Sequence, residues 1–326
     1  MAGVTHSTVS RALRNSPLVN QDTVAKIQRI ARQAGYRTSA AARSLVTRRS
    51  DTIGVVVTNI ADPFVAGVVS GIEETAGQHG LSVFLANSNA EPEREVRVSR
   101  KFEEQRVDGI IVTSSRVGAR YVPLLAHMQV PIVLLNNQHP GQYAHSVMIA
   151  NREASREVTR HLISLGHRRI AYLGDRHGYQ SDTERFAGYR DALREARIRF
   201  QPSLVVHGDG KPEGAETAAA GLFALPEPPT AIFCYNDMSA LGALRRIRAL
   251  GLRVPEDISI AGFDDLFFSQ FLNPPLTTVR QPLRHLGNLA MDTLLKIFAG
   301  EPSEIDIKVP GELIVRESTA PPKEKS

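Results

Sequence analysis

The chain has 326 residues, of which 42% are hydrophobic, enough for two or three domains with sizeable cores. Its apolar runs fall short of the roughly 20 residues that a membrane-spanning helix needs, and Met1 is not followed by the basic and apolar segments of a secretory signal. Cys234 is the single cysteine, which excludes an intrachain disulfide. We therefore expect a cytoplasmic chain with no membrane partner.

Charge is distributed unevenly along the chain. Residues 1–50 carry nine Lys or Arg and one acid, a net charge of +8, whereas residues 51–326 carry 30 bases and 33 acids, a net charge of −3. A basic segment on a mildly acidic body is typical of a nucleic-acid-binding protein. A solvated basic surface without a partner is the alternative.

The stretch Ala2–Leu13 predicts a Gly-containing turn followed by a short helix. Its apolar positions can face inward: Val4, Val9, Ala12 and Leu13. The opposite face carries polar side chains: His6, Ser7, Ser10 and Arg11. This is the layout of the recognition helix of a helix-turn-helix motif, whose first residues reach base edges in the major groove. Hydroxyl groups suit phosphate oxygens, and Arg suits a phosphate or a guanine edge.

The next segment predicts a second helix. Asn15-Ser16-Pro17 interrupts the first helix, Asn20 is a suitable N-cap, and the apolar spacing continues to about Ala34, where Gly35 ends it.

The pattern Ala-Gly-Val-Thr-x-x-Thr-Val-Ser-Arg resembles the DNA-binding head of the LacI–GalR family of bacterial transcription repressors. The resemblance implies a head over residues 1–36. It implies DNA contacts for six residues of the recognition helix: Thr5, His6, Ser7, Thr8, Ser10 and Arg11. Met1 falls where the turn between the two helices of the motif is expected, so the first helix of the motif is expected to be missing. An ordinary amphipathic helix remains the alternative.

Residues 37–50 form a linker with several alanines. In the family this segment is a hinge helix that forms on operator DNA and pairs with that of a second subunit in the minor groove. The resemblance implies that Arg43 contacts DNA and that Leu45 wedges between base steps. This chain has Thr38-Ser39 where relatives have Pro-Asn, and a Leu45 packed on the body is the alternative.

From Asp51 onward, predicted strands alternate with predicted helices, which indicates an α/β fold with parallel sheets. Strands are expected at Thr52–Thr58, Leu81–Ala86, Gly109–Val112, Ile132–Leu135, Arg169–Leu173, Leu204–Val206, Ala231–Cys234 and Ile258–Ala261. The rhythm restarts after Asn151. Two similar halves in series predict two Rossmann-like lobes with a cleft between them.

The resemblance extends to the body, over segments such as Asn236-Asp237-Met238-Ser239-Ala240-Leu241-Gly242 and Pro275-Leu276-Thr277-Thr278-Val279-Arg280-Gln281-Pro282. It implies the fold of periplasmic sugar-binding proteins, an effector-binding and dimerisation domain over residues 51–326 in which the chain crosses between lobes three times. The first lobe is expected at about 51–150 and 282–308, and the second at about 151–281 and 309–319. The tail after Thr319 is expected to be disordered.

Ligands of open α/β sheets bind beyond the carboxyl ends of the strands. By resemblance, the loops there supply eight effector-contacting positions: Asp62, Phe64, Thr113, Asn136, Arg185, Asn236, Asp264 and Gln281. The guanidinium of Arg185 can clamp hydroxyls or a carboxylate, and Asp264 can accept from two sugar hydroxyls. A sugar or sugar acid suits such a polar cleft. Structural roles as caps and turns are the alternative for each: Asp264 could merely cap, and Asn236 could merely start its helix.

Motifs of catalysis are missing from the sequence. It has no Walker-type Gly-Lys-Ser/Thr, no His-Glu-x-x-His and no Gly-x-Ser-x-Gly. Asp264 and Asp265 are adjacent at a strand end, where neighbours point in opposite directions. We expect no catalytic residue, no metal and no cofactor.

These patterns together predict a homodimeric repressor of transcription that binds near-palindromic operator DNA under the control of a small polar effector. A solute-binding protein of the same two-lobed fold, without DNA-binding activity, is the second candidate. An α/β hydrolase or kinase is the third, and turnover without DNA binding would favour it.

The recognition helix generates the first prediction. His6→Ala should change which operator sequences are preferred, because side chains near the start of this helix read base edges. Operator binding should fall steeply with salt, because several phosphates are neutralised. Measuring the affinity of wild type and His6→Ala for a set of operator variants tests both points. An equal loss on every sequence would instead make His6 a backbone contact.

Overall fold

The computed structural model describes residues 3–13, 15–35, 49–115, 128–136 and 145–323. Two helices form the head, α1 (His6–Leu13) and α2 (Gln21–Gln33). The hydroxyl of Thr5 accepts a hydrogen bond from the N–H of Thr8, and Asn20 caps α2 through the N–H of Asp22. Ala12 and Ile27 are the buried side chains between them. Val4, expected to face inward, precedes α1 and is 41% exposed.

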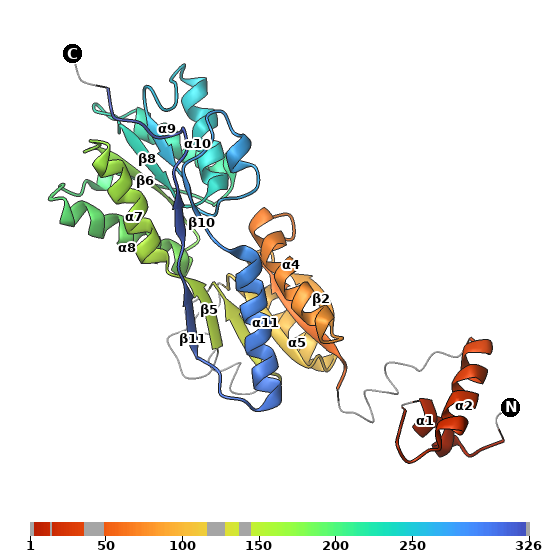
Figure 1. Cartoon of the computed structure of the whole chain (residues 1–326). Coiled ribbons are helices and arrows are strands. Elements are labelled where there is room, and N and C mark those ends of the chain that lie inside the picture. The colour runs from red at the N-terminus through yellow and green to blue at the C-terminus, as the bar shows by residue number, and fades with distance from the viewer. Residues whose placement is uncertain (1–2, 14, 36–48, 116–127, 137–144, 324–326) are drawn as a thin grey trace.

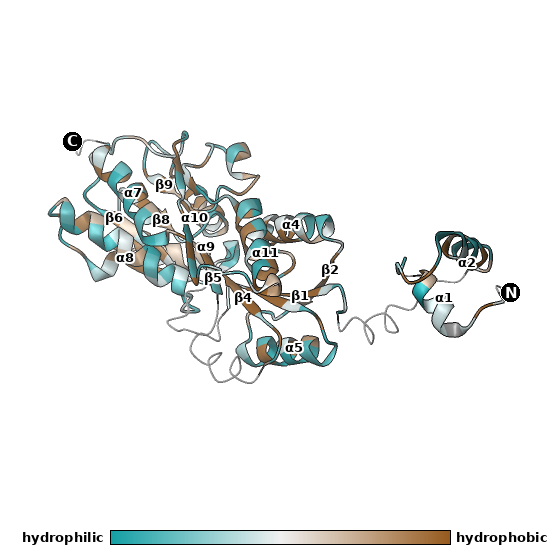
Figure 2. Cartoon of the chain, turned by 60° about the horizontal axis from the view of Figure 1, so that its bottom comes forward, coloured by the Kyte–Doolittle hydropathy of each residue, from teal (hydrophilic) through white to brown (hydrophobic). Residues whose placement is uncertain are grey.

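The first lobe is built on a six-stranded parallel sheet in the order β11-β5-β4-β3-β1-β2 (Figure 1). The strands are β1 (Thr52–Val57), β2 (Ser82–Asn87), β3 (Gly109–Thr113), β4 (Ile132–Leu135), β5 (His145–Ile149) and β11 (Asp306–Val309). Helices α4 (Pro63–Gln78) and α11 (Leu283–Ala299) cover one face, and α5 (Pro92–Glu104) covers the other. The strands form a hydrophobic layer between these helices (Figure 2).

The second lobe has a four-stranded parallel sheet in the order β7-β6-β8-β9. Its strands are β6 (Ile170–Asp175), β7 (Val205–Gly208), β8 (Ala231–Cys234) and β9 (Ser259–Ala261). Helices α7 (Asn151–Ser164) and α8 (Gln180–Glu195) lie on one face, and α9 (Pro212–Phe223) and α10 (Asp237–Ala249) lie on the other. Short 3-10 turns at Pro202–Leu204 and Ser269–Phe271 complete the lobe.

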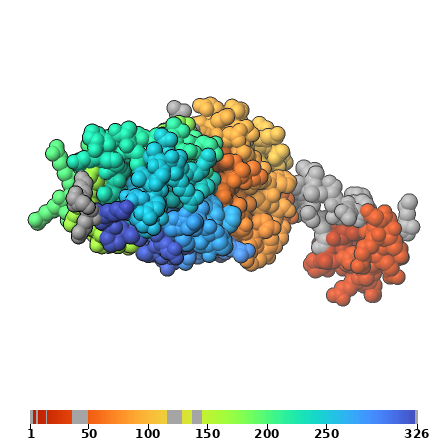
Figure 3. Space-filling model, turned by 90° about the horizontal axis from the view of Figure 1, so that it is seen from above, coloured from red at the N-terminus to blue at the C-terminus, as the bar shows by residue number. Residues whose placement is uncertain are grey.

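The chain crosses between the lobes three times, as the resemblance implied. It passes from β5 into α7, from β10 (Thr278–Arg280) into α11, and from β11 into β12 (Glu312–Ile314). Strands β10 and β12 pair antiparallel, and in Figure 1 they lie beside α7. The alternation of apolar residues in the sequence does not predict four of the strands: β5, β10, β11 and β12. In the space-filling view the two lobes abut directly (Figure 3).

The C-terminal segment differs from the expected disorder. Ser318 is fully buried, and its carbonyl accepts from the N–H of Ile260. The N–H of Ala320 donates to the hydroxyl of Ser259, and the ammonium of Lys323 pairs with Asp257. These contacts fix the chain against β9 as far as Lys323.

No helix within the described ranges is long and apolar enough to cross a membrane.

Helices α4 and α11 pack closely because glycines face the partner helix on both sides. A Cβ built on Gly71 would lie 2.0 Å from the carbonyl oxygen of Arg284. A Cβ on Gly287 would lie 2.1 Å from that of Val68. Since both obstacles are backbone atoms, only a separation of the helices could accommodate a side chain.

Gly287→Ala should therefore lower the free energy of unfolding by roughly 1–3 kcal/mol, the usual cost of overpacking. Gly221→Ala in α9 is the matched control, because its Cβ would meet nothing within 4 Å. The control should raise stability by about 1 kcal/mol through helix propensity. Urea denaturation of both variants measures the difference, and equal stabilities would contradict the packing argument.

Candidate functional site

A cavity of about 700 Å³ lies between the lobes, at the carboxyl ends of the strands of both sheets. The first lobe contributes Thr58, Asn59, Ala61, Asp62, Phe64, Asn89, Ala90, Glu91, Ser114 and Asn136 to its lining. The second lobe contributes Asp175, His177, Tyr179, Arg185, Asp209, Gly210, Lys211, Pro212, Glu213, Tyr235, Asn236, Met238 and Asp264. Its volume is in the range of small-molecule sites.

Arg185 lies at the second-lobe wall of the cavity, and its side chain is only 2% exposed. Nε donates to Oδ1 of Asn151 at 2.9 Å, and Nη1 donates to the carbonyl of Tyr235 at 2.6 Å. The guanidinium carbon lies 3.7 Å from the centroid of the Phe263 ring, a cation–π contact. Nη2 has no hydrogen-bond partner in the described part of the chain, and can donate to a ligand.

Asp264 is the acidic neighbour of this guanidinium, with Oδ1 3.7 Å from Nη1 of Arg185. Oδ1 also accepts from Nε2 of Gln281 at 2.5 Å. Burial raises the pKa of Asp264 well above its ordinary value, and Arg185 offsets only part of this rise. Its φ of +120° is a strained conformation for a residue with a side chain. Such strain is typical of functional positions.

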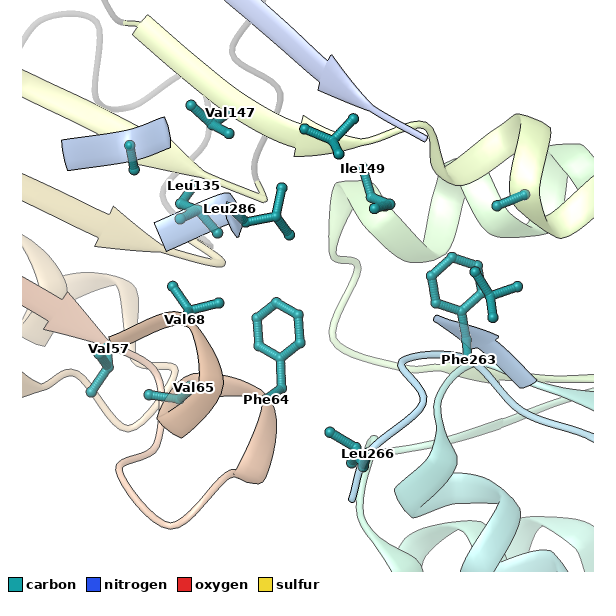
Figure 4. Close-up of a cluster of buried hydrophobic side chains, with 14 of the residues drawn as sticks. Val57, Phe64, Val65, Val68, Leu135, Val147, Ile149, Phe263, Leu266 and Leu286 are labelled. Carbon is teal, nitrogen blue, oxygen red and sulfur yellow. The ribbon is translucent and has the colours of Figure 1, made fainter. Parts of the chain in front are cut away.

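Asp62 and Phe64 bring the start of α4 into the first-lobe wall. Oδ1 of Asp62 accepts from the N–H of Phe64 at 3.0 Å and so caps the helix. Burial raises the pKa of Asp62, and the same N–H partly opposes the rise. The ring of Phe64 lies between first-lobe side chains such as Val68 and the second-lobe residues Phe263 and Leu266 (Figure 4). Phe64 therefore touches both the cavity and the core shared by the lobes.

Six of the eight predicted effector positions line the cavity: Asp62, Phe64, Asn136, Arg185, Asn236 and Asp264. Thr113 and Gln281 lie outside the lining. The hydroxyl of Thr113 donates to the carbonyl of Val56 within the sheet, and its neighbour Ser114 lines the cavity. Gln281 supports Asp264 from behind.

Asn236 and Asn136 both line the cavity, but their side-chain amides differ in hydrogen bonding. Both polar atoms of the Asn236 amide already have a partner, because Oδ1 accepts from the N–H of Ser239 at 2.8 Å and Nδ2 donates to the carbonyl of Gly210. It therefore caps α10, the structural alternative noted above. Asn136, by contrast, adopts a φ of +56°, and its Oδ1 is buried without a partner among the described residues. That oxygen can accept from a ligand.

Several lining residues were missed by the sequence reasoning, although the rule that found the others applies to them. Asn89 follows β2, Asp175 ends β6, Asp209 follows β7 and Tyr235 follows β8. They complete a lining with six acidic residues and two Lys or Arg: Asp62, Glu91, Asp175, Asp209, Glu213 and Asp264, against Arg185 and Lys211. The described cavity wall is therefore acidic overall.

Asp264 and Asp265 point in opposite directions, as expected. Asp265 turns away from the cavity and pairs with Arg280 at 2.8 Å and with Arg316 at 2.6 Å. The described residues contain no group of three or more His, Cys, Asp or Glu placed to hold a metal ion.

The predicted DNA-contacting residues are placed in part. Ser7 and Arg11 are exposed on α1, Thr8 and Ser10 are half-buried, and Thr5 is exposed at the helix start. His6 begins α1. Arg43 and Leu45 lie outside the described residues.

Comparisons with known proteins match both parts of this architecture. Residues 1–39 match the profile described as "Bacterial regulatory proteins, lacI family", and residues 159–319 match that of the "Periplasmic binding protein-like domain". The HTH-type transcriptional repressor CytR of Escherichia coli strain K12 is 35% identical over 324 residues, which cover 98% of this chain and 94% of that protein. The chain belongs to the LacI family of bacterial regulatory proteins.

Solved structures agree with this assignment. The lac repressor dimer bound to operator and the anti-inducer ONPF is 30% identical, with a TM-score of 0.89, and the match covers 98% of this chain and 96% of that one. The transcriptional regulator CelR in complex with cellobiose is 31% identical, with a TM-score of 0.77 and 97% of both chains covered. The two-lobed α/β fold and the DNA-binding repressor class of this LacI-family chain are thereby established.

Asp237 links the cleft loops of this LacI-family chain to a crossing between the lobes. It is fully buried, and Oδ2 accepts from the N–H of Leu266 at 2.8 Å and from the hydroxyl of Ser269 at 2.6 Å. Oδ1 accepts from the hydroxyl of Thr278 in β10 at 2.6 Å. Desolvation outweighs these three donors and raises the pKa of Asp237 to about 6.

This raised pKa predicts a pH effect on stability. As pH falls from about 6 to about 4, Asp237 binds a proton in the folded state before it does so in the unfolded state, so stability rises. Asp237→Asn removes this dependence. In urea denaturation, the free energy of unfolding of the variant relative to that of wild type should rise by about 3 kcal/mol between pH 4 and pH 7. Asp292→Asn, an exposed site on α11, is the control, and parallel pH profiles for wild type and Asp237→Asn would contradict the prediction.

Proposed function

We propose that this chain is a homodimeric repressor whose affinity for operator DNA is set by a small polar effector bound between the lobes. The observation that carries the proposal is the cavity itself, in which Nη2 of Arg185, Oδ2 of Asp264 and Oδ1 of Asn136 lack hydrogen-bond partners among the described residues. Since buried polar atoms are normally paired, the unpartnered Oδ1 of Asn136 favours a ligand with a donor, and the free Nη2 of Arg185 favours one that also has acceptors.

A sugar or sugar acid has such groups on neighbouring carbons. Carboxylates accept from hydroxyls, the guanidinium donates to them, and the rings of Phe64 and Tyr235 offer apolar faces. Between the two, a neutral sugar fits the acidic lining better, because an added carboxylate would be repelled by the six acids. The solved complex of the similar regulator CelR contains cellobiose, which supports this choice.

The contacts of the lobes provide a mechanism. Phe64 lines the cavity and packs with Phe263 and Leu266 across the cleft, so a ligand that moves α4 also changes how the lobes meet. In a dimer, a change in the angle between lobes alters the spacing of the two hinge segments over residues 37–50. The effector then acts through its different affinities for DNA-competent and DNA-incompetent dimers.

Dimer formation is supported by an exposed aromatic surface. Phe267 and Phe271 are 71% and 76% exposed on the loop between β9 and β10. Large exposed apolar side chains mark interaction sites, and the similar lac repressor is a dimer in its operator complex. We propose a second copy of the chain as the occupant, which also matches a near-palindromic operator.

DNA contacts are proposed for the recognition helix and the hinge segment. They comprise Thr5, His6, Ser7, Thr8, Ser10 and Arg11 of the head, with Arg43 and Leu45 of the hinge. The relatives are repressors, and we propose that the chain has no catalytic activity.

The proposal is tested with Asp264→Asn, which keeps the shape of the side chain. A thermal-shift screen of sugars and sugar acids, with cellobiose and ribose included, identifies ligands of the wild type. Asp264→Asn should weaken their binding by about 1–3 kcal/mol, because an amide NH2 replaces a carboxyl oxygen that accepts from the ligand and leaves a buried polar group unmatched. Operator affinity without ligand should remain that of wild type. Asp292→Asn is the control, and unchanged calorimetric affinity in Asp264→Asn would remove Asp264 from the site.

A further inference from the structure

A second cavity lies on the face of the second lobe that is covered by α7 and α8. It has a volume of about 610 Å³ and lies where the start of α7 meets the end of α8 and residues 197–200. Its charged lining consists of five arginines and one acid: Arg152, Arg190, Arg194, Arg197, Arg199 and Asp191. We call it the arginine groove. It shares no lining residue with the cavity between the lobes.

The charge of the arginine groove stands out against its surroundings. Residues 51–326 carry a net charge of −3, yet the groove has a net charge of +4. Its one carboxylate is already shared, because Asp191 pairs with Arg152 at 2.6 Å and with Arg194 at 2.7 Å. The remaining three arginines form no ion pair with any described residue. The groove therefore presents an excess of positive charge to solvent.

Aromatic rings fix one of these guanidinium groups in place. The Cζ of Arg190 lies 5.1 Å from the ring centroid of Phe200 and 5.9 Å from that of Phe186. A guanidinium held over a ring loses less freedom when it binds an anion. Favourable interaction with the carboxyl end of α8 does not account for the cluster, because Arg152 lies in the first turn of α7 and Arg199 lies beyond the end of α8.

We propose that the arginine groove binds a soluble oligophosphate, a small molecule with two or more linked phosphate groups. Planar guanidinium forks match phosphate oxygens, and a single phosphate would leave most of the +4 charge uncompensated. The volume of the groove is that of a small-molecule site. The half-buried ring of Phe200 adds an apolar surface at its edge, where a nucleoside can stack.

Arg197→Gly is the variant that tests the proposal without disturbing the fold. Arg197 follows α8 with a φ of +56°, a left-handed conformation that glycine adopts without steric cost. Arg106→Gly is its matched control, because Arg106 follows α5 in the first lobe with a φ of +58° and lies outside the groove. Each substitution removes one positive charge at a left-handed residue just after the end of a helix.

Isothermal titration of the full chain with sodium tripolyphosphate at 0.15 M salt measures the binding. We expect Arg197→Gly to weaken it roughly ten-fold, the effect of losing one charge-assisted hydrogen bond, and Arg106→Gly to leave it unchanged. ATP in place of tripolyphosphate should bind more tightly, because its base can stack on the half-buried ring of Phe200.

Three outcomes would overturn it. The first is that wild type does not bind tripolyphosphate. The second is that both glycine variants lose affinity equally. The third is that affinity is lost only in a head variant that combines Arg29→Gln with Arg32→Gln. The last result would place the anion on the basic head, whose α2 arginines Arg29 and Arg32 are exposed.

Discussion

The Arg185 guanidinium is buried at the cleft, and the surrounding segments of the second lobe must supply its interaction partners. A charge taken out of water is costly unless its hydrogen bonds are replaced. Here the replacements come from separate elements: Asn151 at the start of α7, the carbonyl of Tyr235 after β8, and Phe263 and Asp264 after β9. Because each must lie within a few ångströms of one group, the segments that follow β8 and β9 and the helices α7 and α8 are held together at the cleft.

The same arrangement leaves selected polar atoms for a ligand. Asp264 is held by Gln281 and Arg185 through Oδ1, which leaves Oδ2, and Arg185 is held through Nε and Nη1, which leaves Nη2. A binding site built in this way has its geometry fixed before the ligand arrives, so little ordering entropy is lost on binding. The strained φ of Asp264 is consistent with a side chain aimed by function rather than by local preference.

Charge divides the chain into regions with different partners. The head is strongly basic, the cleft between the lobes is acidic, and the arginine groove of the second lobe has a local excess of positive charge. A phosphate backbone and an uncharged sugar would therefore be directed to different parts of one molecule. The core around Phe64, which includes side chains of both lobes, connects the cleft to the lobe that adjoins the head.

Local sequence determined much of this protein. Helix caps such as Asn20 and Asp62, buried β-branched strands such as β1 and β4, and the Ala-Gly-Val-Thr pattern identify the class of fold and the family, because each depends on neighbours within a few residues. The resemblance also located Arg185, which lies inside α8, and Asp264, which follows β9. The rest required the tertiary structure. Strand β11 exists because it pairs with β5, about 160 residues earlier, and short strands have no periodicity of their own to reveal such a partner.

Only the tertiary structure decides which polar atoms remain available to a ligand. Asn236 and Asn136 are the same residue type and each follows a strand, yet the amide of Asn236 is held by Ser239 and Gly210 whereas Oδ1 of Asn136 has no partner among the described residues. Thr113 points into its sheet and Ser114 into the cleft, since neighbouring side chains at a strand end face opposite sides. The residue types were readable from the sequence, but their hydrogen-bond partners come from distant segments that only folding brings together.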